Sequence, residues 1–135
     1  MDAVMRRSQD SGKIRTLLGR LCRFHLWEPN YFGIHKALPH EEALKEHGPG
    51  IKRAFTYKAL NKLIQGSAAD MTKKAMLELY KAGITPHIQI HDELDISVKD
   101  DKQAKQIVEI MESAVRLEVP NKVDYETGSN WGSIK

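Results

Sequence analysis

HIQIHDELDISV, residues 87–98, is the stretch that decides the fold. Its apolar residues alternate in a way that predicts a β-hairpin with one apolar face. They share that face only if Ile90 pairs with Leu94 across the hairpin. The next pair outward is then Ile88 with Ile96. We therefore predict an antiparallel hairpin with this register.

This register centres the turn on Asp92 and predicts a three-residue loop over residues 91–93. Such loops usually place a glycine in the left-handed conformation, and no glycine is present here. The loop also carries two adjacent carboxylates, Asp92 and Glu93. They could form an acidic turn that is kept polar for solubility. They could equally hold Mg²⁺ against a substrate phosphate, since carboxylate oxygens are hard ligands, and the residues alone leave both interpretations open.

Two amphipathic helices flank this hairpin in the sequence. The first is expected over residues 55–83, with Gly83 as its stop, and the second over residues 101–115. Asp100 precedes the second helix, where a negative charge is favourable. Gly66 lies inside the first helix, which indicates either a close approach by another group or simple tolerance of glycine. Both helices should pack on the same sheet. In the first helix the apolar residues are Leu60, Leu63, Ile64, Ala68, Met71, Ala75 and Leu79.

The amino-terminal half is harder to interpret. Residues 13–23 favour a strand or hairpin arm that enters a basic turn. Residues 27–50 contain three prolines and little periodicity, which predicts a long connecting loop with a possible short helix at 41–46. We interpret His35, His40 and His47 in this loop as solvated residues, because no Cys/His spacing matches a zinc site.

Composition and charge are those of a single small domain. The chain has 135 residues, one cysteine (Cys22) and a net charge of +3. Residues 1–74 carry 14 Lys/Arg against 7 Asp/Glu, whereas residues 75–135 carry 7 against 11. One half could therefore face phosphates and the other hold metal, or both could be solvated faces. No run approaches the ~20 apolar residues of a membrane span, so we expect an intracellular protein with no membrane partner.

Four segments resemble, in order, family A (polymerase I-like) DNA polymerases. The run IQIHDELDISV resembles motif C, and LNKLIQGSAADMTKKAM resembles the long helix of the palm domain. KIRTLLGR looks like the segment that follows the fingers, and MESAVRLEVPNKVDYETGSNW like the carboxy-terminal helix, strand and Gly-x-Asn-Trp ending. The similarity spans roughly residues 11–131. It implies an α/β (α+β) fold in which a small antiparallel palm-type sheet carries the motif C hairpin and is backed by the two helices. Residues 1–135 would be one partial domain with an inserted loop at 27–50.

The resemblance also implies roles for individual residues. Asp92 falls on the motif C aspartate, a catalytic residue that binds the catalytic metals. Glu93 falls on the adjacent glutamate, which supports the metal site. His91 falls on a histidine near the primer terminus, and Gln65 and Asn61 on polar residues that contact the duplex.

One position departs from the family pattern. Some bacterial members carry an arginine two turns before the glutamine, where this chain has Tyr57 with Lys58 beside it. The resemblance therefore implies that the basic DNA contact is displaced to Lys58 or lost.

The implied function is part of a DNA-dependent DNA polymerase that acts in replication by two-metal nucleotidyl transfer with Mg²⁺. Primer-template DNA and deoxynucleoside triphosphates would be its substrates. The motif A aspartate and the fingers helix of this family precede the segments matched here, so a second polypeptide is expected to supply them, and the chain alone should be inactive. It would be a bacteriophage-type split-gene subunit, a fragment of a longer gene or a remnant, in the cytoplasm of a bacterial or phage-infected cell. The alternative is a non-catalytic DNA-binding or assembly module.

Overall fold

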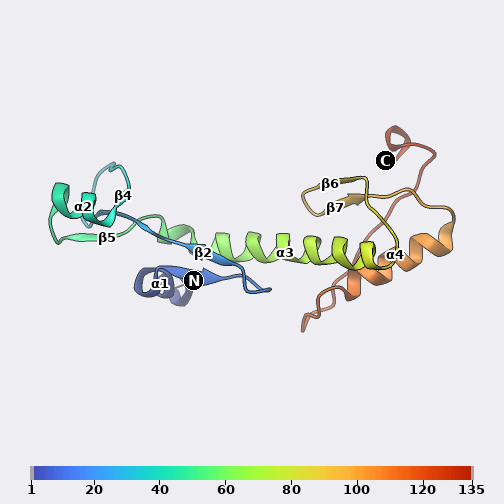
Figure 1. Cartoon of the computed structure of the whole chain (residues 1–135), viewed down its shortest axis with the longest axis horizontal. Helices are drawn as coiled ribbons and strands as arrows, with labels where there is room; N and C mark the ends of the chain where they lie inside the picture. Colours follow the sequence, from blue (N-terminus) through green and yellow to red (C-terminus); the bar gives the residue numbers. More distant parts are fainter. Residues whose placement is uncertain (1, 135) are drawn as a thin grey trace. The chain divides into compact units, whose positions relative to one another are not determined.

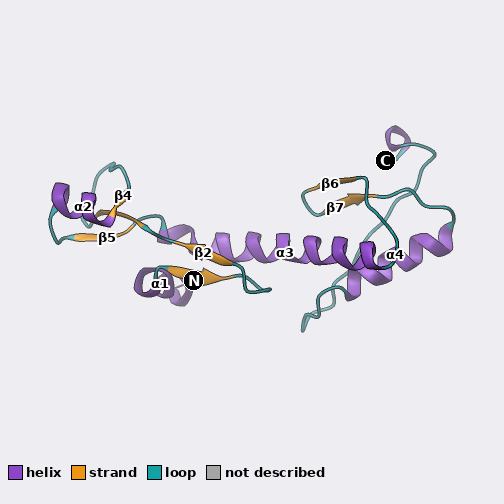
Figure 2. Cartoon of the chain, viewed as in Figure 1, coloured by secondary structure: helices purple, strands orange, loops and turns teal. Residues whose placement is uncertain are grey.

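The computed structural model describes residues 2–134, which form helices and short antiparallel strand pairs (Figures 1 and 2). No helix within this range is both long enough and apolar enough to cross a membrane. The elements in chain order are α1 (Asp2–Ser11), β1 (Lys13–Arg15), β2 (Leu21–Arg23), β3 (Leu26–Pro29), β4 (Leu38–Pro39), α2 (His40–His47), β5 (Ile51–Arg53), η1 (Thr56–Lys58), α3 (Ala59–Lys81), β6 (Ile88–Ile90), β7 (Glu93–Asp95), α4 (Asp101–Ser113) and η2 (Trp131–Ser133).

The chain divides into two compact units, with the boundary after Ser67. We call them the amino-terminal unit, up to residue 67, and the carboxy-terminal unit, from residue 68. Helix α3 runs without interruption through the boundary. The assignment of the chain to one partial domain stays a prediction.

The amino-terminal unit is built on the β1–β2 hairpin, which confirms the hairpin expected at residues 13–23. Ile14 pairs with Cys22 in this hairpin. Ile14, Phe24 and Ala59 form the buried core of the unit. The expected long helix thus begins one short 3-10 turn after residue 55, and its first turn packs on the hairpin.

Helix α1 was not foreseen from the sequence, because it has few apolar residues. Val4 packs against the core of the unit, and tertiary hydrogen bonds attach the rest of the helix. The side-chain nitrogen of Gln9, Nε2, donates to the Thr56 hydroxyl (2.6 Å) and to the Arg53 carbonyl (3.1 Å). The backbone amide of Arg53 donates to Gln9 Oε1 (3.2 Å). Such bonds leave no periodic signal in the sequence.

The expectation of a long connecting loop at residues 27–50 is wrong. This stretch contributes two strands of a three-stranded antiparallel sheet with the order β4-β3-β5. The short helix expected within it at 41–46 is confirmed, because helix α2 spans His40–His47. Trp27 pairs with both Leu38 and Arg53, and the Arg53 guanidinium lies 4.6 Å from the Trp27 ring centroid. The strands are short, and β5 lies just outside the stretch, so local composition gave no sign of the pairing.

The histidines of this region make ring contacts, which the expectation of solvated loop residues did not include. His40 meets the edge of the Trp27 ring at 4.7 Å, and His35 meets Tyr31 at 4.8 Å. The Tyr31 hydroxyl lies 3.3 Å from His47 Nδ1. These contacts stabilise the inserted sheet and helix.

The carboxy-terminal unit has its own core, in which the end of α3 and helix α4 pack on the β6–β7 hairpin. Leu79, Ile84 and Ile107 are buried together, and Leu94 and Ile96 pack against them. Helix α4 begins where the sequence predicted, because the Asp100 side chain accepts a hydrogen bond from the Gln103 amide at 2.8 Å. The two expected helices and their packing on the hairpin are confirmed.

The strand that the resemblance implied after the last helix is not formed within the described residues. Residues 114–130 contain no strand or helix, and Val119 and Tyr125 are exposed. An extended segment becomes a strand only when a neighbouring edge completes its hydrogen bonds. In residues 68–134 neither β6 nor β7 pairs with this segment.

A close approach explains Gly66, which the sequence left open. A Cβ atom at this position would lie 2.8 Å from Thr16 Cγ2. Real Cβ contacts essentially never fall below 3.0 Å. The turn between β1 and β2 therefore packs directly on the α3 backbone, and this contact requires glycine.

Gly66→Ala should destabilise the chain, although alanine is the better helix former by about 1 kcal/mol. Thr16 is buried and its hydroxyl accepts from the Arg20 amide, so it cannot turn away freely. We expect a net loss of about 1 kcal/mol or more in the free energy of unfolding, measured by urea denaturation. Thr16→Ser removes the opposing methyl group and should recover most of this loss in the double variant. A more stable Gly66→Ala protein would contradict the close approach.

Candidate metal-binding turn and nucleic-acid interface

The β6–β7 hairpin reverses in two residues, His91 and Asp92, rather than in the predicted three. Ile90 pairs with Glu93, and His91 adopts a left-handed backbone with φ of 53°. The sequence suggested that a left-handed residue would be needed in the turn, and a histidine rather than a glycine fills that place. A non-glycine residue in this region carries backbone strain, which is common at functional sites.

The shorter turn changes which side chains share a face, so the predicted register is wrong. Gln89 pairs with Leu94, and Ile88 with Asp95. A shift of one residue moves the side chains of one strand to the opposite face relative to its partner. Leu94 therefore faces the core, while Ile88 and Ile90 lie on the other face, where they are 42% and 39% exposed.

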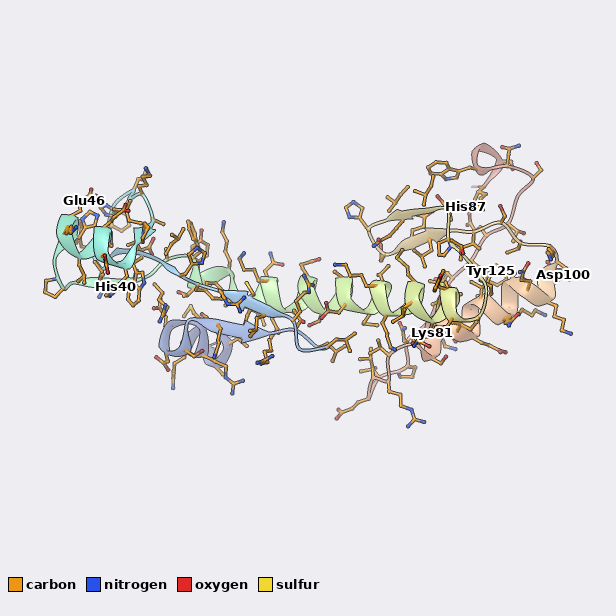
Figure 3. All side chains as sticks on the ribbon, in the orientation of Figure 1. His40, Glu46, Lys81, His87, Asp100 and Tyr125 are labelled. Carbon is orange, nitrogen blue, oxygen red and sulfur yellow. The ribbon has the colours of Figure 1, made fainter. Side chains whose placement is uncertain are left out.

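Hydrogen bonds at both ends hold the hairpin in this arrangement. At its base the His87 amide donates to the Asp95 carbonyl at 2.8 Å, and His87 Nε2 lies 2.9 Å from the Ser97 hydroxyl (Figure 3). At its tip the Gln89 amide nitrogen donates to the His91 carbonyl at 3.1 Å. The turn is thus tied to the strands on both sides.

Three carboxylates lie on or next to this turn. Asp92 and Glu93 are exposed, with Asp92 in the turn and Glu93 as the first residue of β7. Asp95 lies on the same face as Glu93, as a partly buried residue. Its Oδ2 atom is buried and has no hydrogen-bond partner among the described residues. A buried carboxylate oxygen of this kind is completed by a donor or a cation.

The donor set at the turn fits a hard divalent cation such as Mg²⁺, which prefers carboxylate oxygens and retains several waters. Asp92 and Glu93 offer such oxygens at an accessible position. Within residues 2–134 no three His, Cys, Asp or Glu side chains converge into a complete metal site. What the described chain presents is a pair of adjacent carboxylates.

A cavity of about 510 Å³ lies elsewhere in the carboxy-terminal unit, between α3 and α4. Its charged lining residues are Lys74, Lys81 and Glu78. Hydrogen bonds from Lys74 and then Lys81 lower the pKa of Glu78, so the one carboxylate of this lining is already paired with both lysines. This cavity contains no hairpin residue, and we do not consider it a catalytic site.

In the amino-terminal unit, Asn61 and Gln65 are both exposed on α3. They are four residues apart and so project from one face of the helix. Ala59 and Leu63 pack on the hairpin core from the other side of the helix. The structure therefore brings the two predicted DNA-binding residues together on a free helical face.

Lys58 lies beside this face, with its ammonium 5.5 Å from the ring centroids of both Phe55 and Tyr57. Phe55 has a left-handed backbone with φ of 62°, the second such non-glycine residue among those described. Contacts between an ammonium and aromatic rings of this kind are attractive. Lys58 is thus held next to Tyr57, the residue that departs from the family pattern.

A set of basic residues was missed as a candidate site. Lys13, Arg15 and Arg23 are exposed, and Lys13 pairs directly with Arg23 across the β1–β2 hairpin. Like charges in this position repel, which an anionic partner would relieve. The alternation of basic and apolar residues at 13–15 could have revealed this face, which we call the basic hairpin face.

The family model for DNA polymerase family A matches residues 1–133. The chain belongs to this family, and the resemblance found in its motifs is confirmed. It is 39% identical over 126 residues to the DNA-directed DNA polymerase of Pseudomonas phage M6, covering 93% of this chain and 16% of that protein. It is 30% identical to DNA polymerase I of Geobacillus stearothermophilus, covering all of this chain and 14% of that protein.

A solved structure is also similar, the POL domain of Pol1 from M. smegmatis in complex with DNA primer-template and dNTP. The match has a TM-score of 0.67 and 27% sequence identity, and it covers 98% of this chain and 22% of that one. The mixed α/β architecture with small antiparallel strand pairs is therefore that of a polymerase palm-type region, as predicted. The chain spans less than a quarter of the length of each of these three relatives.

The register of the hairpin can be tested by comparing two alanine variants. Leu94→Ala should lower the free energy of unfolding by about 2–3 kcal/mol, because Leu94 packs against the core. Ile90→Ala should cost less than about 1 kcal/mol, because Ile90 is on the exposed face. Urea denaturation of both variants measures the difference. Equal losses would favour the three-residue loop, in which both side chains face the core.

Proposed function

We propose that this chain contributes the motif C carboxylates of a DNA-dependent DNA polymerase. The observation that carries the proposal is the exposed Asp92–Glu93 pair on a tight, strained turn, in a chain that belongs to DNA polymerase family A. Asp92 is the principal metal ligand and catalytic residue, and Glu93 supports it. Because both side chains are exposed, they contribute little to the stability of the core. A role in binding metal ions therefore explains them better than a role in folding.

The proposed cofactor is Mg²⁺, held by Asp92 and Glu93. When bound, two such ions stabilise the attacking and leaving oxygens of nucleotidyl transfer. Asp92 supplies negative charge at the hairpin tip, and Glu93 supplies it at the adjacent strand position. The hydrogen bonds at both ends of the hairpin hold the backbone that carries the two carboxylates.

The proposed substrate is primer-template DNA together with deoxynucleoside triphosphates. Asn61 and Gln65 contact the duplex from the free face of α3, and Lys58 adds a cation beside them. His91 contacts DNA near the primer terminus. The basic hairpin face binds phosphates, which adds affinity that depends on salt and not on sequence.

The remaining parts of the polymerase, above all a motif A aspartate and the fingers, come from a second polypeptide in this proposal. Two metal ions need more ligands than one pair of adjacent carboxylates offers. We therefore expect the chain to be inactive by itself and active in the complex, in the cytoplasm of a bacterial or phage-infected cell where DNA is replicated.

A second candidate function is a DNA-binding or assembly module without catalysis. The basic hairpin face favours it, because phosphate binding requires no metal. The two functions differ in what Asp92 does. In the module Asp92 is dispensable, whereas in the polymerase its loss stops the chemistry.

Asp92→Ala should lower the rate of Mg²⁺-dependent nucleotide addition by at least about a hundredfold in the reconstituted complex. Its carboxylate would hold the metal ion that supplies positive charge to the reaction, while its side chain contributes little to folding. Glu93→Ala should lower the rate by about tenfold, as expected for a supporting group, and Asp95→Ala by less. Single-turnover primer extension measures the rates, with assembly checked by gel filtration.

Asp124→Ala is the matched control, because Asp124 is an exposed aspartate in the same unit and far along the chain from the turn. It should leave extension unchanged. Near wild-type extension by Asp92→Ala, or a larger loss from Asp95→Ala, would mean that the turn does not hold the catalytic metals. The non-catalytic module would then be the better proposal.

A further inference from the structure

The turn between β1 and β2, residues 16–20, contacts α3 at two successive residues, Gly66 and Ser67. The Arg20 guanidinium donates a hydrogen bond to the Gly66 carbonyl at 2.9 Å. The Leu17 amide donates to the Ser67 hydroxyl at 3.0 Å, and that hydroxyl donates to the Leu63 carbonyl at 2.7 Å. All of these residues belong to the amino-terminal unit.

The turn is itself held rigidly, so it can fix what it touches. The Thr16 hydroxyl accepts from the Arg20 amide at 3.1 Å, and the Gly19 amide donates to the Thr16 carbonyl at 2.9 Å. Thr16 is only 8% exposed, and its methyl group leaves room for nothing larger than glycine on α3. Side-chain contact, backbone contact and steric fit all converge on one helical turn.

This helical turn lies directly beside the proposed DNA contacts. Gln65 precedes Gly66, and Asn61 lies one helical turn earlier. At 3.6 residues per turn, Asn61 and Gln65 are about half a turn around the helix from the face that the hairpin covers. Residues 16–20 therefore pack against the face of α3 opposite to Asn61 and Gln65. They limit movement of the helix away from a duplex bound at those two side chains.

We propose that residues 16–20 form a positioning element that holds Gln65 in the geometry required to contact the primer-template duplex. Arg20 is its principal member, since its guanidinium bonds the backbone next to Gln65. It acts through Gln65 and does not itself contact the duplex. The inference rests on the proposed function, because it assumes that Gln65 binds DNA.

Helix carbonyls are ordinarily satisfied by amides within the helix, and a second donor from another element is not needed for helix formation. The Arg20 bond to Gly66 therefore serves to fix the location of the helix. A group that aligns reacting molecules must be held to a fraction of an ångström, which packing behind it provides.

The experiment uses the full chain and a fluorescent primer-template duplex at constant salt. The variants are Arg20→Met, Gln65→Ala and the double variant. Arg15→Met is the control for hydrogen exchange only, because the Arg15 guanidinium donates to the Gly19 carbonyl within the hairpin and not to the helix, whereas Arg15 also belongs to the basic hairpin face and should itself affect duplex affinity. Arg20→Lys tests rescue by a conservative change. Amide hydrogen exchange over residues 61–67 is measured in parallel, without DNA.

Arg20→Met should accelerate exchange in this segment and weaken duplex binding, each by about fivefold, the effect of losing one hydrogen bond. Arg15→Met should leave the exchange unchanged, and Arg20→Lys should restore part of the loss. In the Gln65→Ala background, Arg20→Met should cause almost no further loss of affinity. This last result separates positioning from a general structural role or a direct phosphate contact, both of which predict the same loss in either background.

The inference would be overturned if the losses of duplex affinity in Arg20→Met and Gln65→Ala add up in the double variant. It would also be overturned if amide hydrogen exchange over residues 61–67 is unchanged in Arg20→Met. Failure of the proposed function gives a different pattern. If Gln65→Ala alone does not change duplex affinity, the proposed DNA contact is wrong, and a positioning role for DNA falls with it. The exchange data would then still show whether residues 16–20 hold α3.

Discussion

A reversal of the chain in two residues, His91 and Asp92, determines the arrangement of the carboxy-terminal unit. It requires a left-handed backbone at His91, and in return it separates the two faces of the hairpin. Leu94 and Ile96 anchor one face on the core formed by α3 and α4, and Asp92 lies exposed at the tip. With a loop one residue longer, the same sequence would put different side chains in the core. The candidate metal ligands therefore depend on this turn.

Much of this arrangement could be predicted from the sequence, because the signals are local. The periodic apolar residues indicated α3, and Asp100 marked the start of α4 through its side-chain cap. The motifs around Asp92 and Gln65 indicated the family, which the comparison with family models confirms. The hairpin itself was also predicted, but the register predicted for it was wrong. Alternation of apolar residues favours one face for all of them, and it says nothing of a histidine that accepts a left-handed backbone.

The features that were missed depend on contacts between distant residues. Helix α1 is attached through Gln9 to residues more than forty positions later. Strand β3 lies between β4 and β5, and its pairing with β5 joins residues more than twenty positions apart. The sequence left two interpretations of Gly66 open, and the contact with Thr16, fifty residues earlier, decides between them. The basic hairpin face is the exception, because Lys13 and Arg23 pair within one local hairpin. Roles for Asp92, Glu93 and His91 remain proposals, as do those for Asn61, Gln65 and Lys58.

The central claim is that Asp92 binds a catalytic metal ion. The most direct test is electron paramagnetic resonance of Mn²⁺, used in place of Mg²⁺, in the complex of this chain with the polypeptide that supplies motif A, primer-template DNA and a deoxynucleoside triphosphate. Asp92→Ala should weaken Mn²⁺ binding by at least about tenfold relative to the wild-type complex. An unchanged number of bound Mn²⁺ ions with unchanged affinity would contradict the claim.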